Sequence, residues 1–178
     1  MRLPSSLLVA LTSLLLTPAG CAPGPGEVGV GPEERLAPAP VARECTTGFD
    51  ATGTFCQYNS GFTERQRLVI SDTAAWTSAW QRIWSGHSPQ PELPTVDFER
   101  EVVLLASMGQ RNSGGYVIEL RHETGLANGL EFTVAEMSPD SSTCFVTDAH
   151  SEPLVALRVP RPQGEVRFTE VRELYRCQ

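Results

Sequence analysis

The chain has 178 residues and a net charge of −7, and all 14 of its basic residues are arginine. An acidic chain without lysine offers no basic groove for nucleic acid and no basic patch for an anionic membrane surface. Without its leader and the loose segment that follows, about 130 residues remain for folding, which is enough for one domain with a sizeable core.

Residues 1–20 have the pattern of a secretory signal. Arg2 precedes an apolar run from Leu7 to Leu16, and the small residues Ala19-Gly20 stand before Cys21. The run is too short to cross a bilayer. Cys21 after Ala19-Gly20 resembles a bacterial lipobox, so we expect a lipoprotein signal peptide, export to the bacterial cell envelope, and membrane anchoring through acyl chains on Cys21.

The cysteine count favours lipidation, because the other four cysteines form an even set and Cys21 is left over. Pro18 departs from the lipobox, where an aliphatic residue is usual. In an exported chain we expect disulfides rather than a zinc site, whose CxxC spacing is absent. Four cysteines allow three connectivities. We prefer the one that closes a turn-rich loop and pins the last strand, with bonds Cys45–Cys56 and Cys144–Cys177.

Residues 21–43 are expected to comprise the lipidated Cys21 and a tether that follows it. Between Ala22 and Arg43 the chain holds five prolines and four glycines and almost no bulky apolar side chain. Such a segment cannot bury enough apolar surface to offset the entropy of ordering it. The globular domain is therefore expected over residues 44–178.

The first long element of the domain is an amphipathic helix. It follows a predicted strand at Arg67–Ile70, and Ser71 and Asp72 offer oxygens for its N-cap. The three tryptophans stand at i, i+4 and i+8, which places Trp76, Trp80 and Trp84 on one face. We expect this face to pack on a sheet rather than to form an aromatic binding box.

A run that is apolar at every position, Val102–Ala106, predicts a central strand covered on both faces. A polar loop follows, and Gly114-Gly115 can take positive φ where the chain reverses into Tyr116–Leu120 as a tight hairpin. We expect Arg111 and Asn112 to be exposed at its tip. The candidate partner-binding loop consists of Gly109, Gln110, Arg111, Asn112, Ser113, Gly114, Gly115 and Tyr116.

Alternating apolar residues predict further strands. The strand from Tyr116 and one from Leu130 to Val134 are joined by Asn128-Gly129, which is a strong tight-turn signal, so we expect them to be antiparallel neighbours. Val155–Val159 and Val166–Phe168 repeat the alternation. The predicted fold class is α+β, with an antiparallel β-sheet and one main amphipathic helix packed on it.

The sequence offers little catalytic chemistry. It contains no nucleophile elbow, phosphate loop or HExxH motif, and His87, His122 and His150 lie in separate segments without metal-ligand spacing. Ser113, Asp148 and His150 could form a triad, but any domain of this size offers such combinations. We therefore expect no catalytic residue, no metal and no cofactor.

Three features occur in the order that a known family shows. They are Asn59-Ser60-Gly61, the helix with Trp76 and Trp80, and the loop with Gly109 and Ser113-Gly114-Gly115-Tyr116. With Pro94–Phe98 before the loop and Pro153–Pro160 after it, these spaced partial motifs resemble the C-terminal domain of PrcB-type protease-complex lipoproteins, over residues 60–168. The resemblance implies a non-catalytic partner of a surface protease.

The sequence leaves three functions open. The first is a non-catalytic, lipid-anchored accessory module that stabilises or modulates an envelope protease, or binds another envelope protein, with the loop Gly109–Tyr116 contributing to contact. The second is a direct protease inhibitor that presents this loop as a substrate-like wedge. The third, and least favoured, is a hydrolase.

Overall fold

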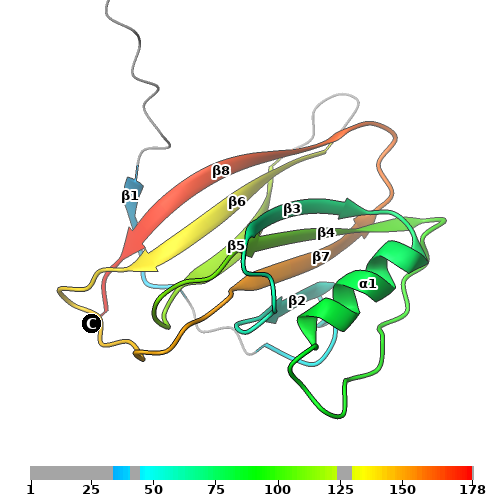
Figure 1. Cartoon of the computed structure of the whole chain (residues 1–178). Coiled ribbons are helices and arrows are strands. Elements are labelled where there is room, and N and C mark those ends of the chain that lie inside the picture. Colours follow the sequence, from blue (N-terminus) through cyan, green and yellow to red (C-terminus); the bar gives the residue numbers. More distant parts are fainter. Residues whose placement is uncertain (1–33, 41–44, 124–129, 178) are drawn as a thin grey trace, which may run out of the picture. The chain divides into compact units, whose positions relative to one another are not determined.

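The computed structural model describes residues 34–40, 45–123 and 130–177, all within one compact unit (Figure 1). The predicted signal peptide, the lipidation of Cys21 and the Asn128-Gly129 turn lie outside the described residues.

The described residues form eight strands and one helix. The strands are β1 (Glu34–Ala37), β2 (Thr54–Gln57), β3 (Arg65–Ile70), β4 (Glu101–Met108), β5 (Val117–Glu123), β6 (Leu130–Pro139), β7 (Leu154–Pro160) and β8 (Val166–Tyr175), and the helix is α1 (Thr73–Ile83). They make two four-stranded sheets, which we name sheet A (β1-β8-β6-β5) and sheet B (β2-β7-β4-β3). The fold is mostly β, with the helix as a minor part.

The prediction of one antiparallel sheet is corrected in two respects. The strands divide between two sheets, and sheet A is mixed because β8 runs parallel to both β1 and β6. The predicted antiparallel pairing of β5 with β6 is confirmed. Apolar alternation identifies a strand and its buried face, but it does not say which distant strand lies beside it, and this accounts for the error.

Strand β4 lies in the middle of a three-layer arrangement. Val103 and Leu105 pack with the tryptophans of α1 on one face of sheet B. Val102 and Leu104 pack with Phe132 of sheet A on the other face. The prediction of a central strand covered on both faces is confirmed, and the helix, sheet B and sheet A follow one another as layers (Figure 1).

Helix α1 packs as the sequence predicts. Asp72 is its N-cap, and its carboxylate accepts a hydrogen bond from the Ala75 amide at 2.8 Å. Trp76 is 1% exposed and Trp80 3% exposed, and Trp84, at the C-cap, is also buried. The two indoles inside the helix donate hydrogen bonds to carbonyls of the proline-rich connection that follows it. The tryptophan face is therefore part of the core.

Strand β1 lies in the segment that the sequence analysis assigned to the tether, and it was missed. Its four residues pair in parallel with Arg172–Tyr175 at the end of β8. Leu36 stays largely exposed, whereas Ala37 packs against the cluster around Tyr175. A strand this short, in a proline-rich stretch, leaves no period for pattern analysis to detect.

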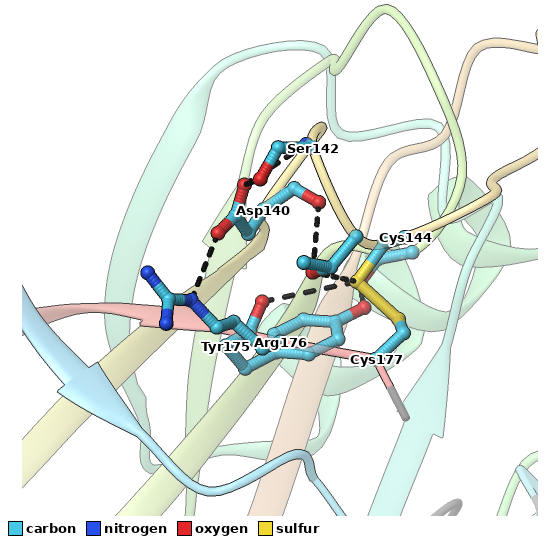
Figure 2. The surroundings of a disulfide bond; sticks show 8 residues. Asp140, Ser142, Cys144, Tyr175, Arg176 and Cys177 are labelled. Atoms are coloured by element: carbon cyan, nitrogen blue, oxygen red, sulfur yellow. Dashed lines mark hydrogen bonds and ion pairs between the residues drawn. A yellow bond between two sulfur atoms is a disulfide. The ribbon is translucent and has the colours of Figure 1, made fainter.

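Both preferred disulfides are present. Cys45 bonds to Cys56 of β2, and Cys144 bonds to Cys177 just after β8. The first fastens the segment before β2 to an edge of sheet B, and the second fastens the β6–β7 connection to the end of the chain (Figure 2). Cross-links of this kind stabilise the fold mainly by restricting the unfolded chain.

Truncating Trp80 to alanine should lower the free energy of unfolding by about 3–5 kcal/mol, because it removes a large side chain from the core. That is a large share of the about 5–15 kcal/mol by which domains are stable. Denaturant unfolding of the disulfide-intact protein measures it. Gln81→Ala, an exposed position on the same helix, is the control and should change stability by no more than about 0.5 kcal/mol. Equal midpoints for both variants would contradict the assignment of Trp80 to the core.

Candidate functional site

The candidate loop, Gly109–Tyr116, connects the two sheets. It leaves β4 in sheet B and enters β5 in sheet A, and these strands do not pair with each other. The prediction of a tight β4–β5 hairpin is therefore wrong. The two strands pack as members of different layers, and the loop crosses from one layer to the next.

Glycine is required at both ends of the loop. Gly109 has a φ of 73°, and a Cβ there would lie 2.9 Å from the Thr63 carbonyl oxygen. Gly115 has a φ of 84°, and a Cβ there would lie 2.6 Å from a methyl carbon of Val146. These backbone conformations are strained for residues with side chains. The positive φ predicted at Gly114-Gly115 is found at Gly115.

Arg111 is held in place rather than exposed at a loop tip. Its backbone exchanges two hydrogen bonds with Ser151, at 2.7 and 3.1 Å. Its guanidinium donates to the carbonyl of Met108 at 2.8 Å and lies 3.9 Å from the Glu136 carboxylate. The prediction of exposure is confirmed for Asn112 and is wrong for Arg111, which is half-buried.

A buried carboxylate joins the sheets beneath the loop. Glu136 of β6 is only 4% exposed, and it pairs with Arg65 and with Arg67, the latter at 2.6 Å. Both arginines, which belong to β3, also reach Glu170 of β8. Burying a carboxylate is costly unless it is paired and hydrogen-bonded. The cluster therefore fixes how the edge of sheet B lies against sheet A, and Arg111 extends it to the loop.

A groove of about 670 Å³ opens beside the second half of the loop. We name it the tyrosine groove, because three of its lining residues are tyrosines. The described lining residues include no Asp, Glu or Arg. They are Ala39, Pro40, Tyr58, Asn59, Gly114, Gly115, Tyr116, Val117, Thr147, Ala149, His150, Ser151, Tyr175 and Cys177. Tyrosine is enriched at protein interfaces because it combines a large apolar ring with a polar tip.

Two of the segments singled out in the sequence, Asn59-Ser60-Gly61 and Gly109–Tyr116, both contribute residues to this groove. Asn59 lines it from one side, and Gly114–Tyr116 line it from another. The two residues after Asn59 are hydrogen-bonded to Glu152. The Ser60 hydroxyl donates to the Glu152 carbonyl at 2.8 Å, and the Gly61 amide donates to the Glu152 carboxylate at 2.7 Å. Segments far apart in the sequence therefore form one site.

Tyr175 lines the groove and is bonded to the loop. Its hydroxyl donates a hydrogen bond to the Gly115 carbonyl at 2.6 Å, which ties the end of β8 to the loop. Burial raises the pKa of the Tyr175 phenol above its ordinary value, and Tyr58 adds to the shift. The phenol therefore stays protonated at neutral pH and remains a donor.

Beside the groove, the β6–β7 connection presents two apolar side chains to solvent. Phe145 is fully exposed, and Val146 is 40% exposed. They precede Thr147, which lines the groove. The Thr147 carbonyl accepts a hydrogen bond from the Gly114 amide at 2.9 Å. We name Phe145-Val146 the apolar tip. Phe145 therefore keeps its whole apolar surface in water, where a partner could bury it.

The segment before the apolar tip is braced by the bonds that Figure 2 shows around Cys144 and Asp140. Cys144 bonds to Cys177, and the backbone amide of Cys144 donates to the carbonyl of Asp140 at 2.8 Å. The Asp140 carboxylate accepts bonds from the hydroxyl and the amide of Ser142, which lower its pKa, and Arg176 lowers it further. The disulfide and these hydrogen bonds limit the conformations available to the connection.

The structure does not assemble the residues considered for catalysis. Ser113 donates to the carbonyl of Gly114 at 3.3 Å, and a ring nitrogen of His150 lies 3.3 Å from the carbonyl of Arg111. Asp148 is exposed. Within the described residues, no group of His, Cys, Asp and Glu is arranged to hold a metal ion. The side chain of His122 lies outside the described part.

Comparison of the chain with protein-family models, with curated proteins and with solved structures gives no match. In the part of the chain that the structure describes, none of the helical structure is long and apolar enough to cross a membrane.

Sequence reasoning found part of the groove, in Asn59 and Gly114–Tyr116, but missed other residues of the groove and its neighbourhood. Tyr58, Phe145 and Glu136 were not singled out. Phe145-Val146 did carry a signal, because two apolar residues follow a cysteine within an otherwise polar stretch. Glu136 carried none, since a single glutamate in an alternating strand is usually solvent-exposed.

Arg111→Ala should lower the free energy of unfolding by about 1–3 kcal/mol, because it removes a charged donor from the Met108 carbonyl and from the Glu136 cluster. Asn112→Ala, at the neighbouring exposed position, should shift it by no more than about 0.5 kcal/mol. Paired denaturant titrations measure both. Two equally small effects would show that the contacts of Arg111 do not hold the loop.

Proposed function

We propose that this chain is a non-catalytic accessory module that binds a protein partner through the tyrosine groove and the apolar tip. It acts at the bacterial envelope, held to the membrane by acyl chains on Cys21. The partner is an envelope protease, which the module stabilises or modulates. That the partner is a protease rests on the resemblance to PrcB-type protease-complex lipoproteins.

The observation that carries the proposal is Phe145. It is fully exposed on a connection braced by the Cys144–Cys177 disulfide, next to a groove rich in tyrosine. Aromatic anchors on preorganised scaffolds dominate the binding energy of protein interfaces. Burying Phe145 in a partner would remove its apolar surface from water without first ordering a flexible loop.

The alternatives receive less support. An inhibitor that offers Gly109–Tyr116 as a substrate-like wedge needs that loop to protrude, whereas Arg111 is bonded to Ser151 through its backbone and to Met108 through its side chain. A hydrolase needs a base within hydrogen-bond reach of its nucleophile, whereas Ser113 and His150 each contact a backbone carbonyl.

The test is capture of the envelope protease with the purified chain. Phe145→Ser should weaken capture by more than about tenfold, because truncating a central anchor costs about 2 kcal/mol or more. Leu93→Ser removes another exposed apolar side chain, outside the groove, and should capture the protease as the parent does. Equal capture by all three proteins would refute the role of the apolar tip.

Protease turnover measured in the same complex distinguishes an accessory module from an inhibitor. An accessory module lengthens the lifetime of the protease or changes its assembly and leaves its turnover in place. Stoichiometric loss of protease turnover on adding the chain would favour the inhibitor instead.

A further inference from the structure

Four edge strands bound the two sheets in the described part of the chain, and three of them are protected. β1 has only four residues. β2 also has only four residues, and the Cys45–Cys56 disulfide joins it to the segment before it. β5 carries Glu119 and Arg121, which pair with each other. Short length, covering segments and charges are the usual ways to keep an edge from pairing with another chain.

The remaining edge, β3, is protected over only half its length. The side chains of Arg65 and Arg67 turn toward Glu136 and Glu170. Leu68, Val69 and Ile70 follow without a charge, and Val69 is 43% exposed. The backbone of β3 pairs with β4 on one side only. Its other side therefore offers backbone donors and acceptors to a further strand.

A second groove, of about 410 Å³, runs between this edge and helix α1. It is separate from the tyrosine groove and shares no lining residue with it. The lining residues are mostly apolar or small. They are Phe62, Leu68, Val69, Ile70, Ser71, Asp72, Ala75, Ser78, Ala79 and Arg82. A strand added to β3 would direct alternate side chains into this groove.

The two ends of the groove differ in charge. Arg82 lies at the end where β3 begins, with its guanidinium over the ring of Phe62 at 4.3 Å and Nε donating to the Gly61 carbonyl. Asp72 lies at the end where β3 finishes. The apolar walls favour aliphatic side chains, and Arg82 favours a carboxylate near the start of β3.

We propose that the β3 edge and the groove beside α1 form a docking site for an extended, aliphatic segment of a partner polypeptide, which adds as a fifth strand to sheet B. Backbone hydrogen bonds to β3 supply affinity. Alternate aliphatic side chains in the groove, and an acidic residue near Arg82, supply specificity. The inference is independent of the proposed function, because it uses neither the tyrosine groove nor the apolar tip.

The probe is a synthetic peptide of about six residues, the usual length of a strand, which alternates valine with threonine and carries a glutamate at one end. It is added to the full chain with both disulfides intact. We expect saturable binding with a dissociation constant below about 1 mM. We also expect slower hydrogen exchange at amides of Arg65–Ile70 that do not bond to β4.

Two substitutions on α1 form a matched pair. Ala75 and Ala74 are both exposed, but only Ala75 lines the groove. Ala75→Arg should weaken peptide binding by about tenfold or more because its side chain occupies the groove, and Ala74→Arg should bind within about twofold of the parent. Unchanged thermal unfolding of both variants shows that they fold. Ser78→Arg, at a second exposed lining position, should repeat the effect of Ala75→Arg.

Three results would overturn the proposal. One is no saturable binding at millimolar peptide, and another is equal weakening by Ala75→Arg and Ala74→Arg. The third is a dimer of the parent chain in sedimentation that Ala75→Arg dissociates, because the occupant would then be a second copy of β3.

Discussion

Burial of β4 on both faces is the constraint on which the rest of the structure depends. A strand that is apolar at consecutive positions cannot leave either face in water. Helix α1 covers one face with its tryptophans, and sheet A covers the other through Phe132 and its neighbours. The three layers, helix α1, sheet B and sheet A, therefore result from covering both faces of this one strand. The loop after β4 crosses from sheet B to sheet A, and Gly114–Tyr116 at its end line the tyrosine groove.

Polar contacts set how the layers meet and leave the groove preformed. Glu136 binds arginines of β3 from within sheet A, and Arg111 links that cluster to the loop. At the groove itself, Tyr175 bonds to Gly115, and the Cys144–Cys177 disulfide braces the segment before the apolar tip. A site whose walls are fixed in this way loses little conformational entropy when a partner binds. A rigid surface is what the proposed interaction module requires, and the apolar groove beside β3 is the second contact surface that we propose.

Local signals in the sequence predicted much of the fold. The apolar run predicted β4, the tryptophan spacing predicted the buried face of α1, and cysteine position predicted both disulfides. What the sequence could not supply was long-range pairing. The parallel β6–β8 contact joins strands far apart in the chain, and β1 is too short to show a period. For the same reason Arg111 was expected at an exposed tip, since its partners Ser151 and Glu136 come from distant segments. The sequence shows Phe145 as an apolar residue after Cys144, but it does not predict that this side chain is exposed, because exposure depends on the fold.

Native-state hydrogen exchange tests most directly the central claim, that the candidate site is rigid because it is tied to the doubly covered strand. The amides of Arg111 and Ser151, which donate to each other's carbonyls at 2.7 and 3.1 Å, should exchange only through global unfolding. Their opening free energies should therefore equal those of the β4 amides and fall in the same way with denaturant. If Arg111 and Ser151 instead exchange far faster than β4, by openings that denaturant does not affect, the loop is not anchored to the core and the claim of a preformed site is wrong.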